Sequence, residues 1–223
     1  KRRGWCGVLC SARRFLHGRR NPYVAREGIP FIVAAVLGTW LAFRYLNPVF
    51  ALLPLLLFGL FWMIFRDPRR QIPAVPLGVV SPVDGRVTAV DLVDRGVVQG
   101  EAHRIFISID VLGTYTARCP VEGVIKDLNT LAAEKVVDYR TSALWVQTDE
   151  GDNVVLQFHG YRLNFAPVAF VRYGERIGQG QRCAYLRLTR VAEVHLPISA
   201  RVLVEPGQRV TAGLDVIGKL PSS

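Results

Sequence analysis

The sequence predicts a mainly β protein in which a membrane-inserted α-helical hairpin precedes an all-β domain. The first observation behind this prediction is an apolar run over residues 29–65 that contains a single charged residue, Arg44. The second is a change after Phe65 to short β-branched segments separated by proline and glycine, which is typical of all-β domains. The third is a net charge of +10 that lies mostly before residue 29. These observations divide the chain into a basic arm over 1–28, a hairpin over 29–65 and a β-domain over 66–223.

The basic arm carries eight Lys or Arg residues and one acid, whereas residues 66–223 carry 19 basic and 17 acidic residues. A nucleic-acid-binding domain would place its basic surface on the folded body, so this distribution argues against a nucleic-acid partner. It suits a segment that lies against anionic lipid, where each Lys or Arg near the surface contributes about 1 kcal/mol. A solubilising or disordered tail remains the alternative for this arm.

The four cysteines are Cys6, Cys10, Cys119 and Cys183. Cys6 and Cys10 have no histidine or further cysteine at zinc-ligand spacing, so no metal site is expected. Nothing in their spacing suggests a disulfide framework either. We therefore expect reduced thiols in a cytoplasmic compartment.

The apolar run is too long for one membrane span of about 20 residues and short for two. Its middle, from Arg44 to Pro48, predicts a turn with a snorkelling cation, and hence two helices over about 29–43 and 49–65. Basic residues flank both ends, so the positive-inside rule places the β-domain on the cytoplasmic face of the cell membrane. Two full spans and a shallow hairpin inserted from one face both stay open. A hairpin buried in a soluble core is disfavoured, because the run has no amphipathic stripe.

The β-domain is expected to begin with short strands and to contain little helix. The clearest strand segments are 78–80, 86–90, 104–109, 143–148 and 153–158. Each is short, rich in β-branched residues and bounded by turn residues. A short helix is expected over 128–137.

One pattern recurs within this domain. The phrase over 81–87 is echoed over 119–125 and more loosely over 196–202, and in each copy a proline is expected to open a strand before a tight turn. A second phrase occurs over 174–180 and again over 207–213. These phrases resemble the flattened barrel, or hammerhead, of biotinyl/lipoyl-like domains. A carrier function is disfavoured, because no lysine lies in the exposed hairpin turn that such a domain modifies.

Several phrases together resemble the short, bacterial and archaeal form of the phosphatidylserine decarboxylase family. They are REGIPF over 26–31, FRDPRRQIP over 65–73, VSPVDGRV over 80–87, RCPVEG over 118–123 and GERIGQG over 174–180. They follow the family's order across residues 26–220. The SPxDG phrase directly after an FRDPxRxIP linker is the most specific part of this resemblance.

The resemblance implies a demanding chemistry. In the family a serine hydroxyl attacks the carbonyl of the preceding glycine, and β-elimination then cuts the chain and leaves a pyruvoyl group. The carbonyl of that group acts as the electron sink for loss of CO2. An Asp and a His near the serine support the proton transfers. Asp84 stands at the Asp of SPxDG, with a local turn residue as its alternative role.

The family's His lies in a DVHVNRxP phrase. The matching stretch here, residues 110–120, is longer and contains no His. His103, His159 and His195 lie elsewhere in the β-domain, and any of them could substitute in space. An ordinary surface or edge position is the alternative for each.

The family's self-cleavage pair lies in a phrase similar to RFGSRVDVxLP, which corresponds here to residues 187–197. A match without gaps places Thr189-Arg190 at the Gly-Ser pair, and arginine cannot act as the nucleophile. A match with one deletion and one insertion places Leu188-Thr189 there. Thr189 keeps the hydroxyl but would give a 2-oxobutanoyl group, and the glycine is absent in either match. An ordinary barrel strand is the alternative for this segment.

The resemblance thus implies a lipid-decarboxylating enzyme of aminophospholipid metabolism with phosphatidylserine as its substrate. Its catalytic residues would be Asp84 and Thr189, and its cofactor a pyruvoyl-type group made from Thr189. A catalytically inactive relative that binds membrane lipid or an active paralogue is the alternative, because the family's His and Gly are missing. Assembly of several copies of this chain into a homo-oligomer is a further possibility.

Overall fold

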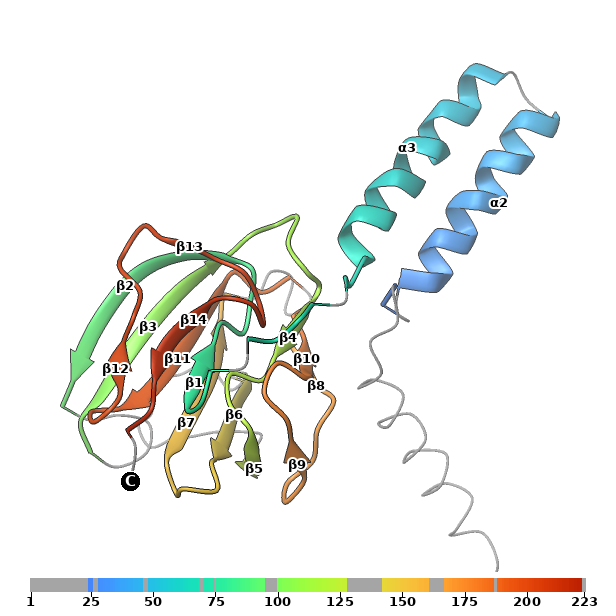
Figure 1. Ribbon diagram of the computed structural model, residues 1–223. Coiled ribbons are helices and arrows are strands. Elements are labelled where there is room, and N and C mark those ends of the chain that lie inside the picture. The colour runs from blue at the N-terminus through green and yellow to red at the C-terminus, as the bar shows by residue number, and fades with distance from the viewer. Residues whose placement is uncertain are drawn as a thin grey trace, which may run out of the picture. The chain divides into compact units, whose positions relative to one another are not determined.

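A computed structural model of the chain describes residues 24–25, 28–45, 48–68, 70–73, 75–94, 100–127, 142–160, 167–186 and 188–221. Most of the basic arm and the helix expected over 128–137 lie outside these residues. The chain forms two compact units, residues 21–69 and the residues from Arg70 onward. Each unit is described by itself below (Figure 1).

The first unit is a pair of helices, α2 (Ile29–Tyr45) and α3 (Pro48–Phe65), which lie side by side in a hairpin (Figure 1). Phe31 near the start of α2 stacks on Phe65 at the end of α3, with ring centroids 5.8 Å apart. The Ala25 N–H donates to the Phe65 carbonyl at 2.8 Å and fixes the entry to the hairpin. Most large apolar side chains on both helices are exposed. Among the described residues, no helix combines the length and hydropathy that a membrane crossing needs.

The second unit is a β-domain of three antiparallel sheets. Its strands are β1 (Gly78–Val80), β2 (Gly85–Val93), β3 (Ala102–Ile109), β4 (Thr116–Arg118), β5 (Gly123–Asp127), β6 (Ser142–Gln147), β7 (Asn153–His159), β8 (Val168–Ala169), β9 (Arg176–Ile177), β10 (Arg182–Tyr185), β11 (Val191–Pro197), β12 (Arg201–Val202), β13 (Arg209–Val210) and β14 (Val216–Lys219). The strands expected from the sequence are confirmed in β1, β2, β3, β6 and β7. The mainly β fold class is confirmed with them.

The domain is built from two similar halves. The large sheet has the order β13-β2-β3-β11-β7-β6-β5-β9, and the two small sheets have the orders β1-β14-β12 and β4-β10-β8. Counting inward from both edges of the large sheet pairs β13 with β9, β2 with β5, β3 with β6 and β11 with β7. The halves also bond reciprocally: the Val80 N–H donates to the Pro120 carbonyl at 2.9 Å, and the Arg118 N–H donates to the Pro82 carbonyl at 2.8 Å.

The first two copies of the recurring phrase therefore occupy equivalent positions, leading into β2 and β5. The third copy differs from the expectation, because Pro197 closes β11 instead of opening a strand. Pro197 lies opposite Ala102, the first residue of β3, so the ladder ends there and loses little from the missing N–H.

One apolar core runs through both halves. It includes Val87, Ile105 and Ile107 from one half and Val146, Val154 and Leu156 from the other, all almost fully buried. On β11 the residues Ala192, Val194 and Leu196 alternate into this core, as the two-residue period of a strand requires.

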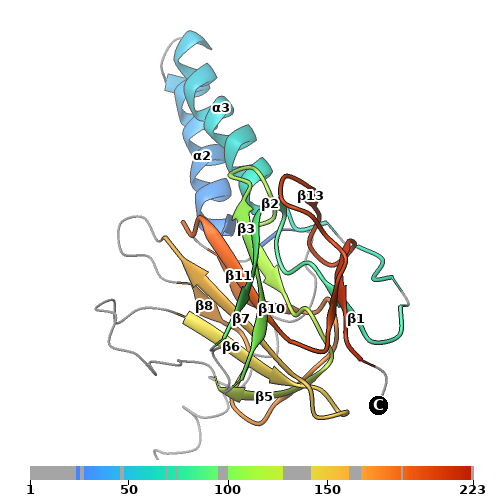
Figure 2. The same ribbon diagram turned by 90° about the vertical axis from the view of Figure 1, so that its left-hand side faces the viewer.

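The large sheet has two ends that matter for function. At one end, which we call the site end, β2 and β11 begin and β3 and β7 end. We call the opposite end of the sheet the far end. The pairing of Gly85 with Ile109 and of Val191 with Ser108 and His159 places these four strand termini together. Both views show the loop between β3 and β4 near β13 at this end (Figures 1 and 2).

Candidate functional site

Three segments that the sequence singled out meet at the site end. The Ile109 N–H donates to the Arg190 carbonyl at 2.8 Å, and the next amide, that of Asp110, donates to the Asp84 carbonyl at 3.0 Å. The Asp84 phrase, the 110–120 stretch and the 187–197 phrase are thus joined by consecutive backbone hydrogen bonds. Segments separated by up to about a hundred residues in the sequence form one site.

The Asp84 carboxylate is the most heavily bonded acid of this site. It accepts from the Thr114 N–H at 2.9 Å, from the Ala212 N–H at 2.8 Å and from both terminal nitrogens of Arg70, one of them at 2.8 Å. Arg70 also donates to the Ala212 carbonyl at 2.8 Å. All these partners are distant in sequence, so Asp84 is more than a local turn residue.

The environment of Asp84 keeps it ionised. Burial alone would raise the pKa of its carboxyl, but the bonds from Arg70, Ala212 and Thr114 outweigh burial and hold the pKa below its usual value. A carboxylate with four donors ties together the segment after the hairpin, the loop after β3 and the loop after β13.

Two glycines, Gly85 and Gly113, allow the backbone segments around Asp84 to approach one another closely. A Cβ on Gly85 would lie 2.0 Å from the Ser108 carbonyl oxygen, so a side chain there would push β2 and β3 apart. A Cβ on Gly113 would lie 2.9 Å from the Cβ of Asp84. The glycine of the SPxDG phrase is therefore required by the packing of two strands.

Thr189 lies at the site end in a tight turn before β11. It is only 7% exposed, and both its N–H and its hydroxyl donate to the Leu186 carbonyl, the N–H at 3.1 Å. The Leu186 N–H in turn donates to the Tyr115 carbonyl at 3.0 Å. The hydroxyl is thus beside the Asp84 loops, but it faces the Leu186 carbonyl and not that of Leu188.

The histidines that could replace the family's His lie at different places in the structure. His159 ends β7 at the site end, and its carbonyl accepts from the Arg190 N–H at 3.3 Å. Its Nε2 lies 2.7 Å from the Glu193 carboxylate. His103 lies near the start of β3, at the far end. His159 is therefore the histidine placed next to the Thr189 turn.

Glu193 is a functional candidate that the sequence reasoning missed. It is buried on β11, where its second oxygen lies 2.9 Å from His195 Nε2. Burial alone would raise its pKa, but the bonds to His159 and His195 lower the pKa to about 2. The available signal was its alternation with the core residues of β11. Within the described residues no group of His, Cys, Asp and Glu side chains converges as a metal site.

Tyr115 is a second missed residue. Counting back five residues from Pro120 in the family's phrase places Tyr115 at the position of the His. Its ring packs 5.9 Å from that of Tyr185, and its carbonyl holds the Leu186 end of the Thr189 turn. The Arg-x-Pro spacing was the signal that could have found it.

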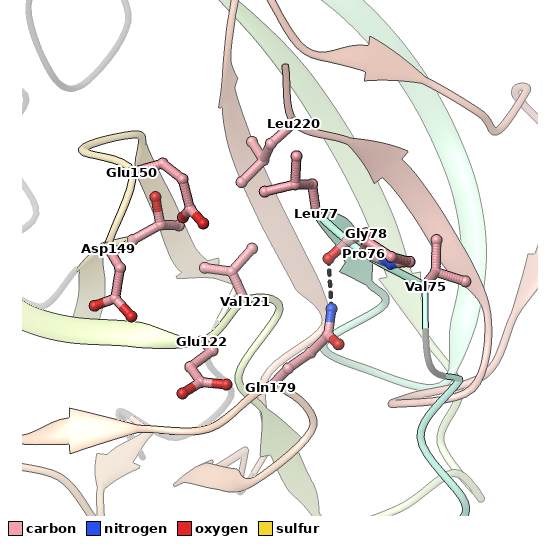
Figure 3. Close-up of a pocket in the computed structure, with 11 residues that line it drawn as sticks. Val75, Pro76, Leu77, Gly78, Val121, Glu122, Asp149, Glu150, Gln179 and Leu220 are labelled. Carbon is pink, nitrogen blue, oxygen red and sulfur yellow. Dashed lines mark hydrogen bonds between the residues drawn. The ribbon is translucent and has the colours of Figure 1, made fainter. Parts of the chain in front are cut away.

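An open cleft of the β-domain lies away from this site. It has a volume of about 320 Å³ and lies at Glu122, the position in the second half that corresponds to Asp84. Figure 3 shows Glu122, Asp149 and Glu150 on one side of it and apolar residues such as Leu77 and Val75 opposite. Arg176 pairs with Glu122 at 3.0 Å and with Asp149 at 2.5 Å, so two of its three acids are already neutralised.

The chain is similar in sequence to known proteins over most of its length. Residues 57–218 match the sequence model of the phosphatidylserine decarboxylase family. The phosphatidylserine decarboxylase proenzyme of Nitrosomonas europaea is 31% identical over 208 residues, which cover 89% of this chain and 96% of the relative. The corresponding proenzyme of Nitrosomonas eutropha is 33% identical over 208 residues with the same coverage, and that of Burkholderia ambifaria is 30% identical over 213 residues, or 90% and 97% of the two chains. The protein belongs to the phosphatidylserine decarboxylase family.

Proposed function

We propose that this protein is a phosphatidylserine decarboxylase, a lyase of phospholipid biosynthesis that forms phosphatidylethanolamine. The relatives are named proenzymes of this decarboxylase, and they match nearly the whole chain. The observation that carries the proposal is the meeting of Asp84, the 110–115 loop and the Thr189 turn at one end of one sheet.

We further propose that residues 29–65 anchor the enzyme in the cell membrane, with the arm (1–28) and the β-domain (66–223) on the cytoplasmic face. The support is the exposed apolar surface of α2 and α3. Water would contact this surface on most sides, whereas lipid would remove it from water at a gain of roughly 25 cal/mol per Å².

The site has a residue from which a pyruvoyl-type group can be made. Thr189 supplies a buried hydroxyl beside the Asp84 loops. When formed, the group would supply the carbonyl that draws electrons from the substrate as CO2 leaves. The β-branched Thr189 and the bulk of Leu188 both oppose the strained turn that a Gly-Ser pair permits, so processing is expected to be slow.

Processing would begin when the Thr189 hydroxyl leaves the Leu186 carbonyl and attacks the carbonyl carbon of Leu188. The new ester C–O bond replaces the peptide C–N bond, and the hydroxyl proton passes to the freed amine. Elimination removes the Thr189 Cα proton, breaks the Cβ–O bond and leaves Leu188 as a carboxylate. Water then replaces the nitrogen, which departs as ammonia, and residues 189–223 begin with a 2-oxobutanoyl group.

We assign the proton transfers to His159 and the positioning of the loops to Asp84. The Asp84 oxygens already accept four hydrogen bonds, so this carboxylate holds Thr114 and Ala212 in place. His159 is held by the Glu193 carboxylate next to the Thr189 turn, an arrangement that keeps an imidazole oriented for proton transfer.

The deciding experiment is an intact-mass measurement of the purified chain together with a decarboxylation assay. We expect two pieces that meet between Leu188 and Thr189, and no cleavage or activity in Thr189→Ala. Thr189→Ser should still be processed, and Ser199→Ala, at the exposed turn after β11, should behave as wild type. Asp84→Asn should slow both steps, and His159→Gln should slow them more than His195→Gln does.

Two outcomes would overturn the proposal in different ways. Activity that persists in Thr189→Ala would show that another residue supplies the electrophile. A chain that stays whole and inert even after Leu188→Gly with Thr189→Ser would favour an inactive relative kept for binding lipid or an active paralogue.

A further inference from the structure

Exposed apolar side chains surround the site end of the β-domain. Val111 and Leu112 form the tip of the turn after β3 and are 91% and 55% exposed. Leu188, in the Thr189 turn, is 45% exposed, and Leu214, in the loop after β13, is 40% exposed. We call these four residues the site rim. Val111 has the highest exposed fraction of any large hydrophobic side chain among the described residues.

The rim residues belong to the loops that hold the site. Gly113 and Thr114, directly after the Val111 turn, contact Asp84, and Ala212, two residues before Leu214, donates to the same carboxylate. Leu188 lies between Leu186, bonded to the Tyr115 carbonyl, and Arg190, bonded to Ile109. The four residues therefore belong to loops that meet at Asp84 and the Thr189 turn.

The second half of the domain serves as an internal comparison for the Val111 turn. In the first half, Arg209 pairs with Asp110 at 2.9 Å, and in the second half the equivalent Arg176 pairs with Asp149. The residue after each aspartate is Val111 at the site end but Glu150 at the far end. The turn geometry therefore does not require an apolar tip, and the exposure of Val111 has another cause.

The site end and the far end of the large sheet also differ in their charged residues. At the site end Asp84 and Asp110 are paired with Arg70 and Arg209, while the side chains of Arg86 and Arg190 are exposed. The turn between β6 and β7 at the far end carries three acids, Asp149, Glu150 and Asp152, of which Asp149 is paired with Arg176. A negatively charged surface would attract the site end and repel the far end.

We infer that the site rim is a membrane-docking surface that inserts into an anionic bilayer and brings the site end to the lipid headgroups. The inference extends the proposed function, from which it takes the lipid nature of the substrate. Apolar tips flanked by exposed arginines match the acyl and headgroup layers of such a surface. The sequence leaves only four residues between Phe65, where α3 ends, and Arg70, which binds Asp84, so the tether to the proposed anchor is short.

The inference is tested by a fluorescent bimane label on the full chain in vesicles that contain phosphatidylserine. Cys6→Ser and Cys10→Ser leave the buried thiols of Cys119 and Cys183, and burial raises the pKa of Cys119 to about 12, so this thiol stays unreactive. One label is placed by Val111→Cys and the matched control label by Glu150→Cys. Lipids with a nitroxide on the upper acyl chain report insertion by quenching.

We expect the label at 111 to shift its emission to shorter wavelengths and to be quenched several-fold more than the label at 150. Equal, weak quenching at both positions would overturn the inference. So would a shifted emission at 111 that lipid nitroxides do not quench but that grows with protein concentration, because that result assigns the rim to a second copy of the chain.

A kinetic readout separates this inference from the proposed function. Val111→Asp with Leu112→Asp should lower decarboxylation of phosphatidylserine in vesicles several-fold more than it lowers turnover of a water-soluble, short-chain phosphatidylserine. Equal loss on both substrates would overturn the docking role. A chain that never cleaves itself but whose 111 label is quenched refutes only the proposed enzyme, whereas an active enzyme with an unquenched label refutes only the docking surface.

Discussion

At the scale of single residues, the site depends on two acids, each of which binds at least one partner from a distant segment. Asp84 binds Arg70, Thr114 and Ala212, and Glu193 binds His159 and His195. Both carboxyls have pKa values below their usual range although both are shielded from water, because charged or N–H donors compensate for the lost hydration. Such carboxylates stabilise the folded state only while they are ionised.

Glu193 gives this statement a testable form. Its pKa falls from 4.5 to about 2 on folding, so its contribution is complete above about pH 4.5 and is lost as the pH drops toward 2. We expect Glu193→Gln to lower the free energy of unfolding by about 2–3 kcal/mol at neutral pH and to flatten its decline between pH 4.5 and 2. Urea titrations in detergent, followed by circular dichroism at several pH values, would measure both effects.

The control for this measurement is Glu150→Gln, which removes an exposed acid at the far end. It should leave the pH dependence of the free energy of unfolding close to that of the wild type. An unchanged slope in Glu193→Gln as well would show that the Glu193 carboxylate does not contribute to acid stability.

At the scale of elements, the same type of turn leads into two equivalent strands, β2 and β5, but has different surroundings in each half. Gly85 and Gly123 begin equivalent strands, and a Cβ on either would press on a neighbouring carbonyl, at 2.0 Å and 2.2 Å respectively. The residue before each glycine is acidic, yet Asp84 is enclosed by donors whereas Glu122 lines an open cleft (Figure 3). The loops that surround the turn before β2, and not the turn itself, make this copy a candidate catalytic site.

The helical hairpin is the element whose role is most directly testable. Deleting residues 29–65 should move the β-domain into the soluble fraction, because the exposed apolar surface of α2 and α3 is what we expect lipid to cover. The intact protein should stay with membranes through high-salt washes, as measured by sedimentation. Release of the intact protein by salt alone would show that electrostatic contact of the basic arm is the real anchor.

At the scale of the whole molecule, charge is unevenly distributed along the chain. Residues 1–28 carry a net charge of +7, from eight basic residues and one acid, whereas the 19 basic and 17 acidic residues over 66–223 give +2. An anionic membrane would therefore be attracted mainly by the arm, with the exposed arginines of the site end adding to it.

Vesicle binding can separate the arm from the rest of the protein. We expect the full chain to bind vesicles with anionic lipid better than neutral ones, and the preference to shrink as salt rises from 0.05 to 0.5 M, roughly, because ions screen exposed charges. A chain lacking residues 1–23 should lose most of the preference in a flotation assay. If the shortened chain keeps it in full, the attraction resides in the β-domain.

The sequence by itself determined the elements of this protein. The two helices follow from a long apolar run with a turn in its middle, and the strands β1, β2, β3, β6 and β7 follow from local patterns of β-branched and turn residues. The resemblance to the family proposed Asp84 and Thr189 as site residues, because they lie in segments that match its motifs. Family membership was also readable from the order of those phrases, as the match over residues 57–218 confirms.

Only the tertiary structure decided what those elements do together. Pairing of strands far apart in the sequence placed Arg190 beside Ile109 and His159, and so brought His159 next to the Thr189 turn. It also joined Arg70 to Asp84 and gathered the apolar rim from three loops. Such contacts depend on the register in which whole strands pair. A local sequence pattern does not reveal that register, because the residues that come into contact are far apart in the chain.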